Sequence, residues 1–189
     1  MRIISGKLKG SSLYMPKNKT TRPLKDIVRE SVFNLLKHSN KISFKIEKSH
    51  ILDLYSGTGS FGLECLSRQA QNVYFVEKER NAVEFLEKNI GKFQLNNKTK
   101  IFISDVLKII EQKKITEKKF DLIFCDPPFE NSNINKLIEL IENNNLLKKT
   151  GIIILHRNKA TNDKLPEYFN IVEERIYGIS KIIFGKFLT

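Results

Sequence analysis

The stretch "ILDLYSGTGSFG", residues 51–62, constrains the fold more than any other part of this sequence. Apolar and β-favouring positions lead into small residues, and a helix-compatible run follows, which predicts a buried parallel strand, a tight turn and a helix start. Gly57, Gly59 and Gly62 have the G-x-G-x-x-G spacing. In such turns the first glycine permits a sharp bend, the second lets the backbone approach a ligand, and the third lets helix and strand pack closely.

Asp53 lies inside this apolar strand, four residues before the first glycine. Burying a carboxylate is costly unless it is hydrogen-bonded. We therefore expect Asp53 to serve the glycine loop or a ligand. A purely bracing role in the turn is the alternative that the residues leave open.

Length and composition predict an ordinary globular domain. The chain has 189 residues, of which 40% are hydrophobic, enough to bury a core without disulfides or metals. Cys65 and Cys125 are far apart and lack CxxC spacing, so no zinc site or disulfide framework is indicated, and Cys125 is expected to be a core residue. No apolar run has the length of a signal peptide or a membrane span, so we expect a cytoplasmic protein with no membrane partner.

Positive charge is concentrated near the N-terminus. The net charge is +12, and residues 1–48 carry twelve Lys and Arg against three acidic residues, a net +9. This predicts a basic N-terminal extension, residues 1–48, attached to a main domain of residues 49–189. Such a distribution is typical of polyanion binders, and nucleic acid fits better than an anionic membrane, although solvated surface lysines are an alternative. The candidate nucleic-acid contacts are Arg2, Lys7, Lys9, Arg22 and Arg29.

Within the extension, Ile, Leu and Tyr alternate with Lys, Ser and Gly over residues 2–15, which predicts a short β-hairpin. Pro23 can begin a helix. The apolar face of that helix is predicted to comprise Ile27, Val28, Ser31, Val32, Leu35 and Leu36. Near its start, basic residues follow one another at a spacing of three to four residues: Arg22, Lys25 and Arg29. They form either an exposed face paired with acidic neighbours or an edge that binds phosphate.

From residue 50 onward, strand and helix patterns alternate, which predicts an α/β fold with a doubly wound, mostly parallel sheet. The predicted strands are residues 50–54, 72–77, 100–104, 120–125 and 151–156, and the predicted helices are residues 60–68, 80–93, 106–113 and 134–143. Residues 169–175 and 181–187 alternate around a Tyr-Gly turn and predict a C-terminal antiparallel hairpin.

Four carboxylates follow or end successive predicted strands: Asp53, Glu77, Asp105 and Asp126. Ligands of open α/β sheets bind at the carboxyl ends of the strands. Glu77 suits the two hydroxyls of a ribose, and Asp105 suits the exocyclic amine of an adenine. Asp105 is also placed to cap the helix that begins at Val106, and the two roles can coexist.

The motif Asp126-Pro127-Pro128-Phe129 is the most specific stretch in the chain. Prolines fix the backbone and leave carbonyls free to accept hydrogen bonds. An acidic side chain beside such a carbonyl forms a pair of acceptors for one amino group, and an aromatic ring offers a face for stacking a base. The alternative is that the two prolines only end the strand.

These stretches resemble a known family. The runs "LDLYSGTGSFGLECLSR" and "FDLIFCDPPF", with Glu77 and Asp105, look like an S-adenosylmethionine-dependent methyltransferase with the seven-stranded, Rossmann-like class I fold. Together with "MRIISGKLKG" and "RPLKDIVRESVFNLL", they resemble the bacterial 16S rRNA guanine-N2 methyltransferase family (RsmD-like). The resemblance implies methylation of one guanine amine in 16S rRNA of the small ribosomal subunit or an assembly intermediate.

The resemblance also implies roles for the residues above. The cofactor-binding set is Asp53, Gly57, Gly59, Gly62, Glu77, Asp105 and Val106, and the target base is held by Asp126, Pro127, Pro128 and Phe129. Because the sulfonium of the cofactor already makes the methyl group electrophilic, direct transfer to the amine requires mainly that the enzyme positions the two reactants. We expect no metal and a monomeric enzyme.

Three other interpretations fit parts of the sequence. A DNA adenine or cytosine amino-methyltransferase shares the acid-Pro-Pro-aromatic motif but usually has a target-recognition region, for which little chain remains. A nicotinamide-dependent oxidoreductase would explain the glycines but not the acid before them or the lack of a substrate domain. A non-catalytic RNA-binding or ribosome-assembly factor has no need of the paired acceptors in "DPPF".

Overall fold

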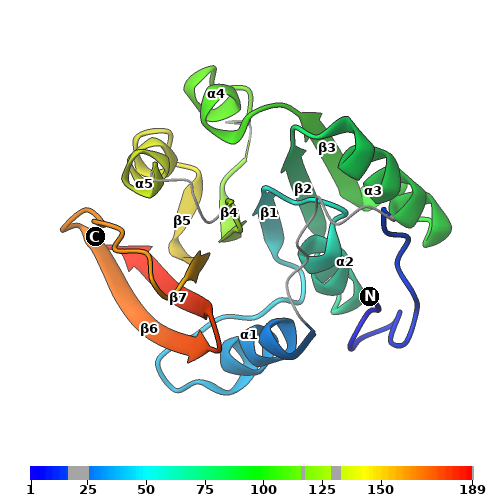
Figure 1. The fold of residues 1–189 in the computed structure, drawn as a ribbon, viewed down its shortest axis with the longest axis horizontal. Helices are drawn as coiled ribbons and strands as arrows, with labels where there is room; N and C mark the ends of the chain where they lie inside the picture. Colours follow the sequence, from blue (N-terminus) through cyan, green and yellow to red (C-terminus); the bar gives the residue numbers. More distant parts are fainter. Residues whose placement is uncertain (17–25, 116–117, 129–132, 189) are drawn as a thin grey trace.

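The computed structural model describes residues 1–16, 26–115, 118–128 and 133–188. Its centre is a seven-stranded sheet in the order β3-β2-β1-β4-β5-β7-β6, in which β5, β7 and β6 pair antiparallel and the other neighbours are parallel (Figure 1). The strands are β1 (His50–Leu54), β2 (Asn72–Glu77), β3 (Thr99–Ile103), β4 (Phe120–Cys125), β5 (Leu147–Asn158), β6 (Phe169–Tyr177) and β7 (Ser180–Phe187). The predicted fold class, including the C-terminal antiparallel hairpin, is confirmed.

Helices cover both faces of the sheet. They are α1 (Asp26–His38), α2 (Ser60–Ser67), α3 (Arg80–Lys92), α4 (Val106–Glu111) and α5 (Ile134–Asn143), with a short 3-10 turn η1 (Asn96–Lys98). The first three contribute to one buried apolar cluster and the last two to another. In α5 the buried residues recur every three or four positions, which is the pattern of a helix with one apolar face.

The strand order places β1 directly beside β4. Their parallel register pairs Leu54 with Cys125, so the chain leaves both strands at the same height. Since β1 continues to β2 on one side and β4 to β5 on the other, this is the switch point of the sheet, where open α/β folds bind ligands. The glycine turn after β1 and the Asp-Pro-Pro segment after β4 therefore emerge side by side.

The N-terminal segment packs into the same core. Arg2 and Ser12 form one antiparallel bridge, and the amide of Ile3 donates to the carbonyl of Ser11 at 2.9 Å, so the chain turns back as predicted. No regular strand forms within residues 1–16, in contrast to the predicted hairpin. Ile3 and Leu13 are buried in the cluster that also contains α1 and α2. A boundary at residue 48 stays a prediction.

Helix α1 is rotated relative to the predicted apolar face. Ile27 is 68% exposed, whereas Arg29 and Phe33 are completely buried. The reason is tertiary, because the Phe33 ring stacks on Phe61 of α2 at 5.1 Å between centroids. Successive helix residues differ in direction by about 100°, so this contact turns Ile27 towards solvent. The predicted start at Pro23 lies outside the described residues.

Strand β5 is longer than the predicted residues 151–156. It runs to Asn158 because β7 pairs with its last residues, including Arg157 with Lys181 and Asn158 with Ser180. Antiparallel pairing with a strand some 25 residues later is not visible in the local pattern, and it extends the sheet past the height at which Asp126 leaves β4.

Within the described ranges, no helix is long and apolar enough to cross a membrane.

Candidate active site

The glycine turn after β1 contains one open position. Gly57 has a φ of +54°, and apart from its two chain neighbours no atom of the described residues lies within 4 Å of the place where a Cβ would be. Its amide donates to Oε2 of Glu77 at 2.7 Å. A positive φ favours glycine, and the free space in front of the backbone is a cradle that a side chain would fill.

The other two glycines are required by packing. A Cβ on Gly59, whose φ is +81°, would lie 2.3 Å from Cδ1 of Leu86, so the space is occupied by α3. Among the described residues, the Cβ direction is thus occupied at Gly59 and open at Gly57, and a contact of the Gly59 backbone with the cofactor stays a prediction. A Cβ on Gly62 would lie 2.3 Å from Cε1 of Phe75 on β2, which agrees with the expected close approach of helix and strand.

Asp53 braces this turn. It is 1% exposed, and its Oδ2 accepts the amide hydrogen of Gly62 at 2.9 Å. Burial raises the pKa of Asp53 well above its ordinary value of 3.8; the Gly62 amide opposes this effect, and the charges of Asp126 and Glu77 add to it. With so little exposed surface, Asp53 supports the loop in this conformation, which is the alternative that its sequence position left open.

Glu77 is held by three backbone amides. Besides Gly57, its carboxylate accepts from Lys78 at 2.8 Å and Glu79 at 2.9 Å. Each carboxylate oxygen can accept more than one hydrogen bond, so the fixed group retains capacity for ribose hydroxyls. The charges of Glu77 and Asp126 both contribute to the raised pKa of Asp53, which places these two carboxylates in its neighbourhood.

Asp105 and Val106 form the start of α4. Oδ1 of Asp105 accepts the amide hydrogen of Lys108 at 3.1 Å, so Asp105 is the helix cap that its position predicted. Val106 as a whole residue is 2% exposed and belongs to the core. The cofactor contacts of Asp105 and Val106 stay predictions.

Asp126 lies at the switch point, and its side chain is 20% exposed. Its Oδ1 lies 2.7 Å from Nδ1 of His156, the residue on β5 that follows the partner of Cys125 in the strand register. The other ring nitrogen of His156, Nε2, lies 2.9 Å from Oγ of Ser180 on β7. A buried histidine thus connects the acid of the Asp-Pro-Pro segment to the C-terminal hairpin.

Arg157 contacts the same segment at its backbone. Its Nη1 donates to the carbonyl of Pro128 at 3.4 Å, and its Nε and Nη2 donate to the two oxygens of Asp163 at 2.8 and 2.9 Å.

The sequence had indicated no role for four residues around Asp126: His156, Arg157, Asp163 and Ser180. The available signal was that the fifth parallel strand also ends in polar residues beside those of β4.

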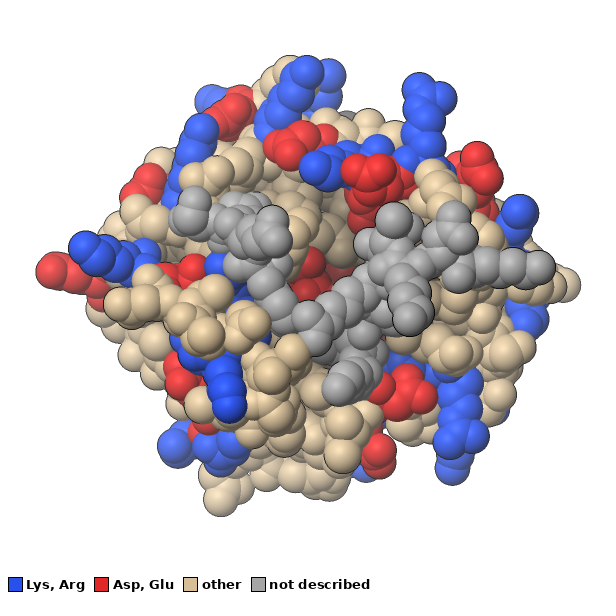
Figure 2. Space-filling view, in the orientation of Figure 1, with Lys and Arg blue, Asp and Glu red and all other residues tan. Residues whose placement is uncertain are grey.

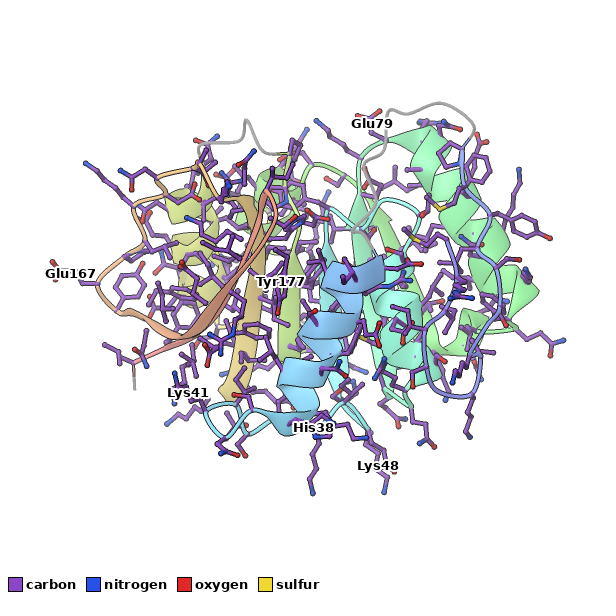
Figure 3. All side chains as sticks on the ribbon, turned by 60° about the horizontal axis from the view of Figure 1, so that its bottom comes forward. His38, Lys41, Lys48, Glu79, Glu167 and Tyr177 are labelled. Carbon is purple, nitrogen blue, oxygen red and sulfur yellow. The ribbon has the colours of Figure 1, made fainter. Side chains whose placement is uncertain are left out.

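The predicted nucleic-acid contacts separate in the structure. Arg2, Lys7 and Lys9 are exposed. The amide of Lys7 donates to the carbonyl of Ser67 at 2.8 Å, at the end of α2 far from the glycine turn. In Figure 3, Lys48 and His38 likewise lie at the end of the molecule opposite Glu79.

Arg29 does not remain a candidate for contact with nucleic acid. It is completely buried, and its Nη2 donates to Oδ1 of Asp26 at 3.0 Å and to the carbonyl of Arg2. Burial lowers the pKa of Arg29. The guanidinium ties α1 to the N-terminal segment and has no surface for a phosphate. Arg22 and Phe129 lie outside the described residues, and their roles stay predictions.

The surface around the switch point is hollowed. Figure 2 shows a depression in the middle of this face with Asp and Glu atoms at its floor, whereas Lys and Arg atoms, interspersed with Asp and Glu atoms, lie mainly towards the outline of the molecule. In the described part of the chain, no group of three or more His, Cys, Asp or Glu residues is arranged to hold a metal ion.

Cys125 is buried, and burial raises the pKa of its thiol. This residue is therefore a core residue, as predicted, and not a nucleophile.

The sheet order, the glycine turn and the carboxylates at the switch point define a class I methyltransferase. The comparisons with known proteins specify the family. The family model described as "Conserved hypothetical protein 95" matches residues 1–186, and the chain belongs to this family, the RsmD family.

Similar proteins cover all or nearly all of the chain. The "Ribosomal RNA small subunit methyltransferase D" of Buchnera aphidicola subsp. Baizongia pistaciae is 32% identical over 100% of this chain and 92% of its own length. The protein of the same name from Haemophilus influenzae is 31% identical over 95% of this chain and 90% of its own length. A solved structure described as "Putative methyltransferase yhhF from Escherichia coli" has a TM-score of 0.84 and 25% identity, and covers 100% of this chain and 98% of its own.

Proposed function

We propose that this enzyme transfers a methyl group from S-adenosylmethionine to the exocyclic 2-amino group of a guanine in 16S rRNA. The observation that carries this proposal is the Asp126-Pro127-Pro128 segment, which leaves β4 beside the glycine turn of β1. The names of the relatives from Buchnera and Haemophilus support small-subunit rRNA as the substrate. We expect the protein to act as a cytoplasmic monomer on a small subunit or an assembly intermediate.

The residues on the β1–β2 side fit the cofactor. The open surface at Gly57 suits the close approach of a ligand to the backbone, and the amide-held carboxylate of Glu77 suits ribose hydroxyls. Asp105 would accept from the adenine amine through its second oxygen, since Oδ1 caps α4. When bound, S-adenosylmethionine supplies a methyl group that its sulfonium makes electrophilic.

The residues after β4 supply the acceptors for the target amine. A guanine amino group is conjugated with its ring and is therefore a poor nucleophile. If its two hydrogens donate to the Asp126 carboxylate and to the Pro127 carbonyl, a pyramidal nitrogen is favoured and its lone pair becomes available. Enzymes that modify bases generally take the base out of its stack, and Phe129 is the proposed stacking partner.

Nucleoside mass spectrometry tests this function. The purified protein, S-adenosylmethionine and unmodified small subunits are incubated, and digested rRNA is assayed for N2-methylguanosine. Asp126→Ala serves as the control for the active site. Methylation of an adenine or cytosine amine, or of DNA in preference to rRNA, would contradict the proposed substrate, and binding without any transfer would favour an assembly factor.

A further inference from the structure

The carboxylate of Asp126 contacts a buried histidine, which in turn contacts a serine on β7. Its Oδ1 contacts Nδ1 of His156 at 2.7 Å, and Nε2 of His156 contacts Oγ of Ser180 at 2.9 Å. The His156 side chain is 8% exposed and the Asp126 side chain 20% exposed. Among the described residues, the hydrogen bond of the Asp126 carboxylate is made by Oδ1.

The two contacts determine where the ring carries its proton. An ionised carboxylate oxygen can only accept, so Nδ1 of His156 must be the donor to Asp126. In the neutral ring, Nε2 then accepts from the hydroxyl of Ser180; in the charged ring, Nε2 donates to the same oxygen. Because a hydroxyl can do both, Ser180 is compatible with either state, and the proton on Nδ1 is present in each.

We propose that His156 is a positioning residue for methyl transfer. It engages one oxygen of Asp126, fixes the side-chain rotation, and leaves Oδ2 for the amine of the target base. This inference rests on the proposed function of Asp126. The advantage is preorganisation, because a carboxylate that is already oriented does not lose rotational freedom when the base arrives.

Arg157 acts on the backbone of the same segment. Its donation to the Pro128 carbonyl at 3.4 Å, with its fork held by both oxygens of Asp163, restrains the chain directly after the proposed Pro127 acceptor. The end of β5 thus contacts both the carboxylate and the proline backbone through consecutive residues. β5 can do this because its pairing with β7 continues as far as Asn158, opposite Ser180.

Two isosteric substitutions separate positioning from simple packing. The amide nitrogen of His156→Asn takes the place of Nδ1 and can still donate to Asp126. In His156→Gln, the amide takes the place of Nε2, which keeps a polar group near Ser180 but removes the donor to Asp126. Both replacements are uncharged, and Asn is the smaller of the two. A role in packing alone therefore predicts a greater loss for His156→Asn than for His156→Gln, which is the reverse of the order expected from positioning.

The measurements are the single-turnover rate of methyl transfer on small subunits, the affinity for S-adenosylmethionine by calorimetry, and the melting temperature. We expect His156→Gln to slow transfer about ten- to a hundredfold, the scale of a small misplacement of reacting groups. His156→Asn should restore the rate to within about threefold of the wild type. Cofactor affinity should remain within about twofold in both, since the proposed cofactor contacts lie on β1, β2 and the start of α4.

Ser180→Ala provides an independent test that does not alter the ring. Without the hydroxyl, the ring loses the contact that orients Nε2 and is held less firmly towards Asp126, and we expect a severalfold slower transfer. Equal rates for His156→Gln and wild type would overturn the proposal. If His156→Gln does not fold, an unchanged rate in Ser180→Ala would overturn it instead.

The wild-type reaction distinguishes failure of this inference from failure of the proposed function. If the wild type methylates a different amine, the guanine assignment is wrong, and the Asn and Gln variants are compared on that amine. If the wild type methylates guanine and the two variants lose activity equally, the function stands and the positioning role of His156 does not. If the wild type transfers no methyl group, both fail together.

Discussion

At the scale of single residues, two carboxylates of the switch point have different environments. Asp53 is 1% exposed and serves the amide of Gly62. Asp126 retains exposed surface and is oriented by His156. Burial makes the first a structural group with a raised pKa, whereas the second combines partial exposure with a fixed direction, which is what a substrate-binding acceptor requires.

Substitution of Asp126 tests the proposed acceptor. Asp126→Ala removes one of two acceptors and should slow single-turnover transfer about a hundredfold or more, the scale for loss of a positioned polar group. Asp126→Asn keeps an oxygen without the charge and should be intermediate. Cofactor affinity should be largely retained in both. Asp121→Asn, which neutralises a carboxylate at the other end of β4, is the matched control; a fully active Asp126→Ala enzyme would leave the prolines as a strand terminator.

Asp53→Asn should alter how stability depends on pH. Because the folded-state pKa of Asp53 is raised above its ordinary 3.8, the folded protein binds this proton more tightly than the unfolded chain. The stabilisation of the folded state by this proton is fully present below pH 3.8 and is lost as the pH rises towards the folded-state pKa of Asp53. The melting temperature of Asp53→Asn relative to wild type should therefore increase as the pH rises above about 3.8 towards the folded-state pKa. A difference that is independent of pH would contradict the raised pKa.

At the scale of elements, the β1–α2 turn uses glycine for two physical reasons. At Gly57 the backbone faces open space, while at Gly59 and Gly62 it faces Leu86 and Phe75. The open position at Gly57 suits the approach of a ligand. The last two allow α2 to pack close to β2 and α3, so their substitution acts on the core.

Gly57→Ala should therefore weaken cofactor binding with little unfolding. A left-handed backbone costs an L-residue about 1 kcal/mol, and the added methyl group occupies the proposed ligand surface. Gly178→Ala is the matched control, since Gly178 has a φ of +61°, lies in the turn between β6 and β7, and has no described residue beyond its chain neighbours within 4 Å of the place of a Cβ. We expect similar decreases of melting temperature but a tenfold or greater decrease of affinity for S-adenosylmethionine only in Gly57→Ala, measured by calorimetry. Equal affinities would exclude Gly57 from the cofactor site.

At the scale of the whole molecule, basic residues lie at both ends of the sheet. Lys7, Lys9 and Lys48 lie near the end of α2, where the backbone amides of Lys7 and Lys48 donate to the carbonyls of Ser67 and Gln69. Exposed Lys78, Lys108 and Lys159 instead follow the carboxyl ends of β2, β3 and β5. A base bound at Asp126 would bring its neighbouring phosphates to the second group.

Two triple substitutions test this arrangement. Changing Lys78, Lys108 and Lys159 to Gln should weaken binding to small subunits and reduce the log–log salt slope by roughly one unit for each phosphate that the variant no longer binds. The same change at Lys7, Lys9 and Lys48 should have a smaller effect on affinity and turnover. Filter binding over a range of salt concentrations gives both slopes. A larger effect of the second set would favour the basic N-terminal surface that the charge distribution predicts.

The linear pattern of apolar and polar residues determined most of the elements. The predicted limits of β1, β2, β4 and α5 agree with the structure, because burial of a strand or helix face leaves a local periodicity. The glycine turn, the strand-end acids and the Asp-Pro-Pro segment were also visible, since each depends on residue type at short spacing. Their convergence followed from the rule that parallel strands end at one edge.

Only the tertiary structure decided which side chains share an environment. The contact of Asp126 with His156 depends on the parallel pairing of β4 with β5, and the contact with Ser180 on the antiparallel return of β7. The burial of Arg29 and the exposure of Ile27 depend on how α1 is rotated against α2. Such contacts join residues tens of positions apart, and packing energy selects them after the local elements have formed, so no short-range pattern in the chain encodes them.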